Sequence, residues 1–214
     1  TPGYAAGNIL NLLCQLQPKL SHYDFSELTV WQAYLRTIHL HQFNFKNADL
    51  AKSVFTETFG SILSVAFSPD GEILATAGVT GEIQLWHVAD GKLLLSWKAH
   101  TRWILSIAFS PDGQMLATGS DEKTAKLWDA HTGKYLKTFQ GHTSWIFNVA
   151  FSPNSQILAS VSDDRTIQFW DVGTGEALRT FKGHTGQVHS IAFSPNGEIF
   201  ASGSNDSTIK LWDV

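Results

Sequence analysis

The chain has 214 residues, and 15 Lys and Arg stand against 19 Asp and Glu, so its formal net charge is −4. This balance argues against a nucleic-acid surface, which needs clustered positive charge to displace counterions from phosphate, and no apolar run approaches the roughly 20 residues of a membrane helix. Cys14 is the single cysteine, so an internal disulfide is excluded and a reducing, cytoplasmic compartment is expected.

The first element expected is a helix within residues 1–19. Ile9, Leu12, Leu13 and Leu16 follow at i, i+3, i+4 and i+7, the spacing that places apolar side chains on one face of an amphipathic helix. We interpret this helix as a cap over the open end of the repeats that follow, because stacked repeats bury their cores only against neighbours.

A five-residue period runs through residues 20–57, reading SHYDF, SELTV, WQAYL, RTIHL, HQFNF, KNADL and AKSVF. The last residue of each five is apolar, at Leu20, Phe25, Val30, Leu35, Leu40, Phe45, Leu50 and Phe55. The pattern resembles the pentapeptide-repeat family, with NADL at 47–50 as its best match. The resemblance implies a small right-handed quadrilateral β-helix, with one pentapeptide per side and these apolar residues pointing inward.

A second period, of 42 residues, governs residues 53–214. FSPDG at 67–71 recurs as FSPDG at 109, FSPNS at 151 and FSPNG at 193. LWH at 85–87 recurs as LWD at 127, FWD at 169 and LWD at 211. Runs of β-branched and aromatic residues alternate with the turn residues Pro, Gly, Asp and Asn, which predicts four short strands in each repeat.

These repeats resemble the WD-repeat family. In three of them a Gly-His or Ala-His pair is followed by a Trp-Asp pair, and the Trp stands 28 positions after the His. The resemblance implies an all-β propeller whose blades are four-stranded antiparallel sheets arranged around an axis. The four repeats are expected at about 60–100, 101–142, 143–184 and 185–214.

Phe55 belongs to both periods. It ends the last pentapeptide, and it also lies 42 residues before Trp97, which recurs as Phe139 and Phe181 in the expected outer strands. The β-helix is therefore expected to run directly into an outer strand at about 53–58. That strand could complete the last blade and close a four-bladed ring, or the repeats could form an open arc that lacks further blades; the open edges of an arc would permit self-association.

Polar residues recur at fixed positions in the repeats. His184, Ser204, Asp206 and Trp212 suggest the Ser-His-acid triad of a hydrolase, but similar sets recur 42 residues apart, and one active site needs no copying. The WD family uses these positions as structural hydrogen-bond tetrads, which suits an indole that only donates and a carboxylate that only accepts. The expected tetrad residues are His100, Ser120, Glu122, Trp128, His142, Ser162, Asp164, Trp170, His184, Ser204, Asp206 and Trp212.

The first repeat departs from this pattern. Thr58, Gly78 and Thr80 stand where the other repeats have His, Ser and an acid, so Trp86 is expected to stand alone. The first blade is therefore expected to be the loosest.

Two tryptophans point to a binding surface. Trp103 and Trp145 follow the tetrad His at the same place in neighbouring repeats, where the resemblance implies the top face of a propeller. Tryptophan is a preferred anchor of protein-binding hot spots, although single exposed aromatic residues also occur without a function. Residues expected to share this face are Arg102, Asp121, Phe147, Asp163, His189 and Asn205.

The favoured function is a non-catalytic scaffold that binds a protein or senses a ligand. A hydrolase on a propeller is the alternative, but it would need a unique polar cluster. No metal or other cofactor is expected, because His39 and His41 lack a third ligand and HTGKY at 131–135 lacks two residues of a phosphate loop.

The order of helix, pentapeptides and WD repeats is similar to the C-terminal part of bacterial, especially cyanobacterial, signal-transduction NTPases of the NB-ARC/NACHT type. The chain begins with Thr1 rather than Met. An ATPase domain is therefore expected before Thr1, with this chain as its sensor arm.

Overall fold

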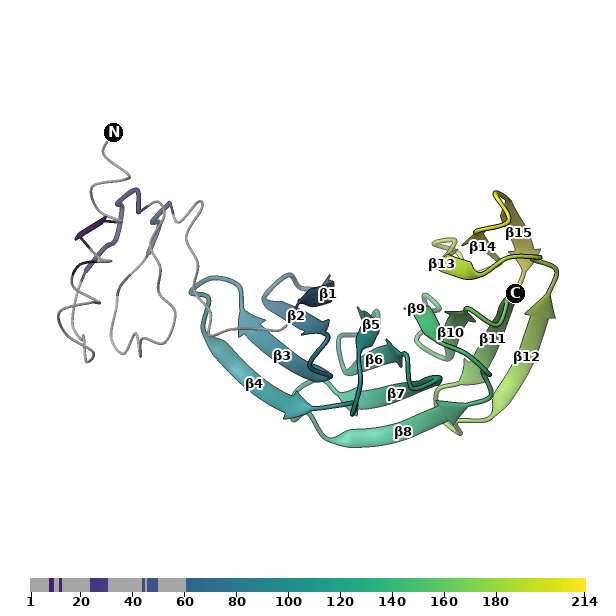
Figure 1. The fold of residues 1–214 in the computed structure, drawn as a ribbon. Coiled ribbons are helices and arrows are strands. Elements are labelled where there is room, and N and C mark those ends of the chain that lie inside the picture. The colour runs from purple at the N-terminus through teal and green to yellow at the C-terminus, as the bar shows by residue number, and fades with distance from the viewer. Residues whose placement is uncertain (1–7, 10–11, 13–23, 31–43, 45, 50–60) are drawn as a thin grey trace. The chain divides into compact units, whose positions relative to one another are not determined.

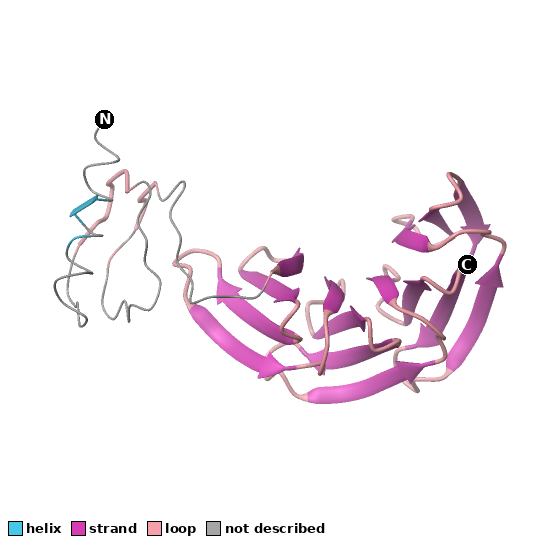
Figure 2. Cartoon of the chain, viewed as in Figure 1, coloured by secondary structure: helices cyan, strands magenta, loops and turns pink. Residues whose placement is uncertain are grey.

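The computed structural model describes residues 8–9, 12, 24–30, 44, 46–49 and 61–214. The chain divides into two compact units, Thr1–Phe59 and Gly60–Val214. Within the described residues, every named strand lies in the second unit, as Figure 2 shows. None of the helical residues in that described part belongs to a helix long and apolar enough to cross a membrane.

The second unit consists of four antiparallel sheets, each a meander of consecutive strands. Sheet 1 contains β1 (Ile62–Phe67), β2 (Ile73–Gly78), β3 (Glu82–His87) and β4 (Leu93–Lys98). Sheet 2 contains β5 (Ile104–Phe109), β6 (Met115–Ser120), β7 (Thr124–Asp129) and β8 (Tyr135–Gln140). Sheet 3 contains β9 (Ile146–Phe151), β10 (Ile157–Ser162), β11 (Thr166–Asp171) and β12 (Ala177–Lys182). Sheet 4 contains β13 (Val188–Phe193), β14 (Ile199–Ser204) and β15 (Ile209–Asp213).

The FSPDG motif forms the turn between the first two strands of a sheet. After β1, the amide of Ile73 donates to Ser68 Oγ at 2.9 Å and the amide of Glu72 donates to Asp70 Oδ1 at 3.0 Å. Gly71 adopts a left-handed φ of 75°, a conformation that glycine reaches without steric cost. The same bonds form around Ser110 after β5, so the recurring motif fixes the recurring hairpin.

The hydrophobic core lies between consecutive sheets. Ala77, Ile83 and Leu85 of sheet 1 pack with Ile104 and Leu116 of sheet 2, and equivalent clusters join sheet 2 to sheet 3 and sheet 3 to sheet 4. The sheets stand side by side along an arc, with β1, β5, β9 and β13 on its concave side and β4, β8 and β12 on its convex side (Figure 1). Each sheet is therefore a blade, and the apolar faces that meet at the three joints between consecutive sheets are buried.

The four described sheets do not close into a ring. Sheet 4 has three strands, and no described strand pairs with the outer side of β15. The outer strand expected at 53–58, with Phe55, lies outside the described residues. Of the two arrangements that the sequence left open, the described sheets adopt the open arc.

The N-terminal unit is described in part. Asn8, Ile9 and Leu12 are helical, but Ile9 and Leu12 are 55% and 57% exposed, so the structure shows no cap with a buried apolar face at these positions. Leu13 and Leu16 lie outside the described residues.

Two parallel bridges in this unit join residues 20 positions apart. Asp24 pairs with Asn44, and Thr29 pairs with Asp49. Phe25 and Val30 are buried, with exposures of 7% and 0%. The other apolar positions of the five-residue period, Leu20, Leu35, Leu40, Phe45, Leu50 and Phe55, lie outside the described residues.

Candidate functional site

A chain of hydrogen bonds crosses each of sheets 2, 3 and 4. In sheet 3, Trp170 Nε1 donates to Ser160 Oγ at 2.9 Å, and Ser160 Oγ lies 2.8 Å from His142 Nε2. His142 Nδ1 lies 2.9 Å from Asp164 Oδ2, which also accepts the amide hydrogen of Thr143 at 2.9 Å. The chain therefore ties β10 and β11 to the loop that leads into β9.

The other two sheets contain the same bonds. In sheet 2, Thr118 Oγ1 lies 2.8 Å from His100 Nε2 and 3.1 Å from Trp128 Nε1. In sheet 4, Ser202 Oγ lies 2.8 Å from both His184 Nε2 and Trp212 Nε1. The acids Glu122 and Asp206 accept from the other imidazole nitrogens, at 3.0 and 2.8 Å.

In each of these three hydrogen-bond networks, the hydroxyl is not the one that the sequence predicted. Thr118, Ser160 and Ser202 occupy the position that was assigned to Ser120, Ser162 and Ser204, so these three assignments are wrong. The reason is strand register.

Trp170 lies opposite Leu158 across the β10–β11 ladder. Ser160 lies two residues beyond Leu158 on the same face of β10, which is about 7 Å along the strand at the usual rise per residue. Ser162 lies four residues beyond Leu158, about 13 Å along the strand. Counting residues from the Trp-Asp pair across the hairpin would have identified the nearer hydroxyl.

The serines that were wrongly assigned to the tetrads have another role. Ser120 Oγ donates to the carbonyl oxygen of Trp103 at 2.6 Å and accepts from the amide of Glu122 at 3.1 Å. Ser162 Oγ donates to the carbonyl oxygen of Ser144, one residue earlier in its loop, at 3.3 Å and accepts from the amide of Asp164 at 3.1 Å. These serines therefore hold the loop before each inner strand against the following hairpin.

Sheet 1 retains part of this hydrogen-bond network. Trp86 Nε1 donates to Thr76 Oγ1 at 3.2 Å, so the expectation that Trp86 stands alone is wrong for the same reason of register. Thr80 occupies the acid position, and its Oγ1 accepts a long bond of 3.4 Å from the amide of Glu82. Thr58, at the His position, lies outside the described residues.

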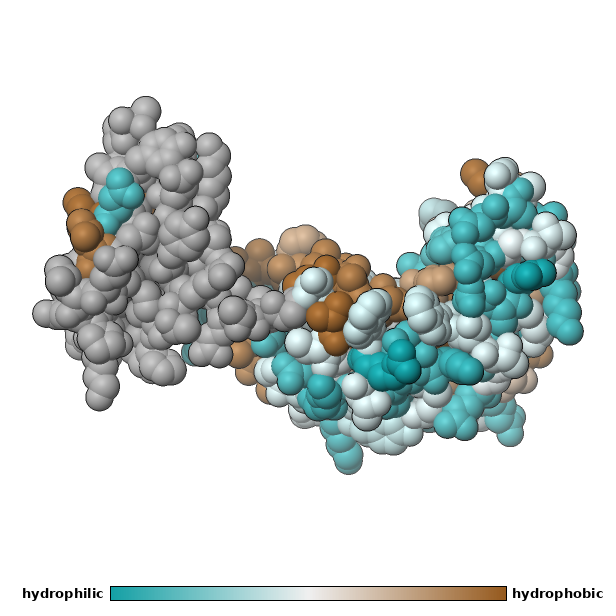
Figure 3. Space-filling view, in the orientation of Figure 1, coloured by the Kyte–Doolittle hydropathy of each residue, from teal (hydrophilic) through white to brown (hydrophobic). Residues whose placement is uncertain are grey.

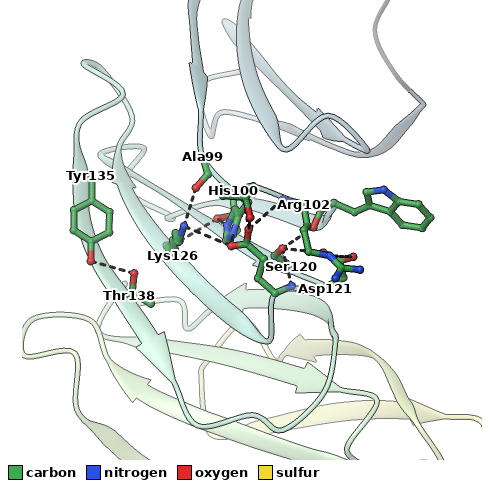
Figure 4. A network of polar contacts seen from close by, with 12 residues as sticks. Ala99, His100, Arg102, Ser120, Asp121, Lys126, Tyr135 and Thr138 are labelled. Atoms are coloured by element: carbon green, nitrogen blue, oxygen red, sulfur yellow. Dashed lines mark hydrogen bonds and ion pairs between the residues drawn. The ribbon is translucent and has the colours of Figure 1, made fainter.

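Burial fixes the charge state of the tetrad in sheet 2. Burial of the His100 imidazole lowers its pKa to about 4, so His100 is neutral at pH 7. Burial alone would raise the pKa of Glu122, but hydrogen bonds from Thr101 and His100 lower it to about 2. A neutral imidazole donates from Nδ1 to the carboxylate and accepts at Nε2 from the Thr118 hydroxyl, which itself accepts from the indole. Figure 4 shows His100 and the polar contacts around it, with Ala99, Arg102, Ser120, Asp121 and Lys126 labelled.

The acids of sheets 3 and 4 follow the same logic. Burial tends to raise the pKa of Asp164, but hydrogen bonds from His142 and Thr166 outweigh it and hold the pKa well below its usual range. Hydrogen bonds from Thr208 and His184 lower the pKa of Asp206 in the same way. All three acids are therefore ionised wherever the chain is folded near neutral pH.

Burial argues against a catalytic triad in sheets 2 and 3, whereas in sheet 4 His184 is buried and Ser204 is part-buried. The side chains of Ser120, Ser160 and Ser162 have 0% exposure, and His142 has 7%. A nucleophile must come within contact distance of its substrate, which a fully buried hydroxyl cannot do. Across the described ranges, no group of three or more His, Cys, Asp and Glu side chains is placed to hold a metal ion.

The loops before the inner strands carry the exposed aromatic residues. Trp103 immediately precedes β5 and Trp145 immediately precedes β9, with exposures of 46% and 41%. Each carbonyl oxygen accepts the amide hydrogen of the residue before the tetrad acid, from Asp121 at 3.3 Å and from Asp163 at 3.0 Å. Asn205 makes the equivalent bond in sheet 4. The two indoles are therefore presented on loops that the framework holds in place.

The acidic and amide residues expected on this face bond to the same loops. Asp121 is 4% exposed and accepts from Arg102 Nε at 3.0 Å. Asp163 accepts from Ser144 Oγ at 2.6 Å and from the Gln187 side chain of the next sheet. Asn205 Nδ2 donates to Gln187 Oε1 at 2.7 Å. These residues position the loops, while the Arg102 side chain remains 63% exposed.

Three rings form a continuous aromatic group across sheets 3 and 4. Trp145 and Phe147 meet edge to face with centroids 6.4 Å apart. Phe147 stacks on His189 at 4.5 Å with an interplanar angle of 25°. Since Phe147 lies in β9 and His189 in β13, this group spans the boundary between two sheets, and the structure brings these three predicted residues together.

The repeats match known families. Residues 91–129, 133–171 and 175–213 match the family described as WD domain, G-beta repeat, and together they make up more than half of the chain. Residues 35–108 match the Anaphase-promoting complex subunit 4 WD40 domain.

Two curated relatives come from Nostoc sp. (strain PCC 7120 / SAG 25.82 / UTEX 2576). The "Uncharacterized WD repeat-containing protein alr2800" is 55% identical over 102 residues, covering 48% of this chain and 8% of the relative. The "Uncharacterized WD repeat-containing protein alr3466" is 48% identical over 102 residues, covering 47% of this chain and 7% of the relative. The aligned part is thus less than a tenth of each relative.

Proposed function

Because this chain belongs to the WD-repeat family, we propose that it is a non-catalytic scaffold whose exposed aromatic face binds a protein partner. WD repeats generally mediate protein interactions. The observation that carries the proposal is the placement of Trp103 and Trp145, half exposed at the same position of adjacent sheets.

The way the loops are held supports this proposal. Binding costs the conformational entropy of every loop that must be ordered, so a surface that is already held in place binds more tightly. Ser120 and Asp121 hold the Trp103 loop, and Ser162 and Asp163 hold the Trp145 loop. Large rigid side chains on a preorganised surface are typical of hot spots, and the exposed Arg102 adds a planar donor beside them.

We also propose that residues 20–57 form the short pentapeptide β-helix. Four pentapeptides per turn require neighbouring coils to pair 20 residues apart, which is the separation of both parallel bridges. Glu27 and Asn47, also 20 apart, share left-handed φ values of 58° and 56°. The buried Phe25 and Val30 occupy the positions expected to point inward.

The proposed role in the cell is the recognition arm of a larger cytoplasmic signal-transduction protein of the NB-ARC/NACHT type. The support is the order of the sequence segments, together with relatives that are far longer than this chain. This part of the proposal rests on resemblance, and it does not identify the partner.

The experiment selects binders from a phage-displayed library of random peptides on the immobilised 214-residue chain. The affinity of each selected peptide is then measured by titration calorimetry for the wild type, Trp103→Ala, Trp145→Ala and Leu178→Ala. Leu178 is the control, because it is 53% exposed but lies in the outer strand β12.

We expect at least one tryptophan variant to weaken binding about tenfold or more, as hot-spot truncation does, while Leu178→Ala binds as the wild type does. Selected peptides whose affinity is unaffected by both tryptophan substitutions would contradict the proposed binding face.

The alternative function is a hydrolase. It is disfavoured because His100, His142 and His184 and the serines of sheets 2 and 3 are buried, and because one active site needs no copying in every repeat. Turnover of ester substrates that disappears in Ser162→Ala but not in Ser160→Ala would support the hydrolase instead.

A further inference from the structure

The same joint between neighbouring sheets occurs three times in the chain. We call the face of a sheet that meets the following sheet its forward face, and the opposite face its rear face. In the first joint, Ile83 and Leu85 on the forward face of sheet 1 pack with Ile104 and Ile107 on the rear face of sheet 2. The second and third joints use residues 42 and 84 positions further along the chain.

Two of the three joints, those between sheets 1 and 2 and between sheets 2 and 3, also contain a specific hydrogen bond. The amide of Ile107 donates to Ser64 Oγ at 3.1 Å, and the amide of Val149 donates to Ser106 Oγ at 3.1 Å. Both bonds connect residues 43 positions apart, one repeat plus one residue. These two joints therefore have a fixed register in addition to their apolar contact, and in the third joint Asn148 stands at the acceptor position.

The forward face of sheet 4 lacks this cover. Ile209 is 80% exposed, whereas Ile83, Ala125 and Ile167 at the same position are at most 1% exposed. Leu211 is 70% exposed, whereas its equivalents Leu85, Leu127 and Phe169 are at most 2% exposed. Ser190, which occupies the position of the acceptors Ser64 and Ser106, is exposed as well.

The rear face of sheet 1 is open in the complementary way. Val65 is 58% exposed, whereas Ile107, Val149 and Ile191 at the same position are between 3% and 8% exposed. Ile62 is 41% exposed, and its equivalents Ile104, Ile146 and Val188 are fully buried. Figure 3 shows apolar surface gathered at the end of the arc where β1 lies.

We propose that the forward face of sheet 4 binds the rear face of sheet 1 of a second copy of this chain. The two open faces are the two halves of a joint that the chain already makes three times. In the new joint the Val65 amide of one copy donates to Ser190 Oγ of the other, and Ile209 and Leu211 cover Ile62 and Val65. Apolar sheet surface of this extent is seldom left in water, and a second copy supplies its matching cover at both ends.

The number of copies follows from the geometry of a head-to-tail contact. Such a contact joins different faces, so it generates a ring when the rotation closes and an open filament when it does not. Two copies contribute eight sheets, within the four to eight blades typical of propellers, whereas three copies would contribute twelve. We therefore infer a closed pair with two identical joints. This interface is separate from the proposed peptide-binding face.

The test measures the mass of the full 214-residue chain by light scattering after size exclusion, between about 1 and 100 μM. The expected mass is twice the 23.6 kDa of one chain. Leu211→Asp and Val65→Asp each place a charge in both joints of the pair, so each variant alone is expected to have the mass of one chain. Leu178→Asp, at an exposed position of β12 away from both faces, is expected to keep the mass of the pair.

Mixing the two disrupted variants tests the direction of the contact. The intact Leu211 face of Val65→Asp can dock on the intact Val65 face of Leu211→Asp, so an equimolar mixture is expected to recover mass above that of one chain. A contact between two identical sheet 4 faces would be broken by Leu211→Asp and unaffected by Val65→Asp, and this result would overturn the proposal. A wild type with the mass of one chain at 100 μM, or of more than two chains, would also overturn it.

Hydrogen exchange of the wild type provides a measurement that does not depend on variants. The Val65 amide is expected to exchange more slowly as the protein concentration rises, because Ser190 of the second copy accepts it. The Val149 amide already bonds Ser106 within the chain, so its protection is expected not to change by this route. Equal exchange of Val65 at low and high concentration would contradict the proposed joint.

Discussion

Removing the Ser160 hydroxyl tests the assignment of the tetrad most sharply. The Ser160 side chain is fully buried, and its Oγ bonds His142 Nε2 at 2.8 Å and Trp170 Nε1 at 2.9 Å. Ser160→Ala removes both bonds and leaves two buried polar groups without that partner. Each lost bond contributes about 1 kcal/mol and an orphaned buried group costs about 1–3 kcal/mol, so we expect a loss of about 2–3 kcal/mol. For a unit of this size, that corresponds to a fall of roughly 5–10 °C in Tm.

The assay is urea unfolding at pH 7 with tryptophan fluorescence, alongside two further variants. Ser160→Thr keeps the hydroxyl, and Thr118 already occupies this position in sheet 2, so we expect it to lose less than half as much. Ser162→Ala removes only the 3.3 Å bond to Ser144 and the 3.1 Å bond from Asp164, and a loss of about 1 kcal/mol is expected. A larger loss for Ser162→Ala than for Ser160→Ala, or a loss below about 0.5 kcal/mol for Ser160→Ala, would refute the assignment.

Three further predictions concern pH and the backbone. The pKa of His100 is about 4 in the folded chain and near 6.5 when unfolded, so the unfolded state binds more protons between these values. The contribution of His100 to the free energy of unfolding is therefore complete above pH 6.5, and it falls by roughly 3 kcal/mol as the pH approaches 4. Urea unfolding at several pH values should show a shallower decline of this free energy for His100→Gln than for the wild type. Parallel curves for the two proteins would show that His100 is not the cause of the decline. Gly81→Ala should lower the free energy of unfolding by more than about 2 kcal/mol, because Gly81 has a φ of +71° and the new Cβ would lie 2.3 Å from the His100 carbonyl oxygen. An unchanged Tm would contradict this expectation and show that the backbone around Gly81 can move away. Arg165 has a left-handed φ of 68°, so Arg165→Gly should gain about 0.5–1 kcal/mol by relief of backbone strain, and a measured loss would mean that the Arg165 side chain contributes more than its backbone costs.

The strands and their turns were accessible from the sequence because their causes are local. The FSPDG motif determines its own hairpin through Ser68, Asp70 and Gly71, and alternation of apolar residues determines which face is buried. The comparisons confirm the WD repeats that these patterns predicted.

The tetrad hydroxyl was missed because residue spacing does not include strand register. Ser160 and Ser162 lie on the same face of β10, and only the pairing of Trp170 with Leu158 shows which one the indole reaches. The open ends were undetermined for a related reason. Ile209 and Ile83 stand at equivalent positions with similar neighbours in sequence, and their exposures of 80% and 0% depend on whether another sheet covers them.

The proposed binding face is tested most directly by labelling the chain with 5-fluorotryptophan and following its ¹⁹F spectrum while a selected peptide is added. The chain has eight tryptophans, and single Trp→Phe variants assign their signals. The signals of Trp103 and Trp145 are expected to move on binding, while those of the buried Trp128 and Trp170 remain in place. Movement confined to signals other than those of Trp103 and Trp145 would show that the partner binds elsewhere on the chain.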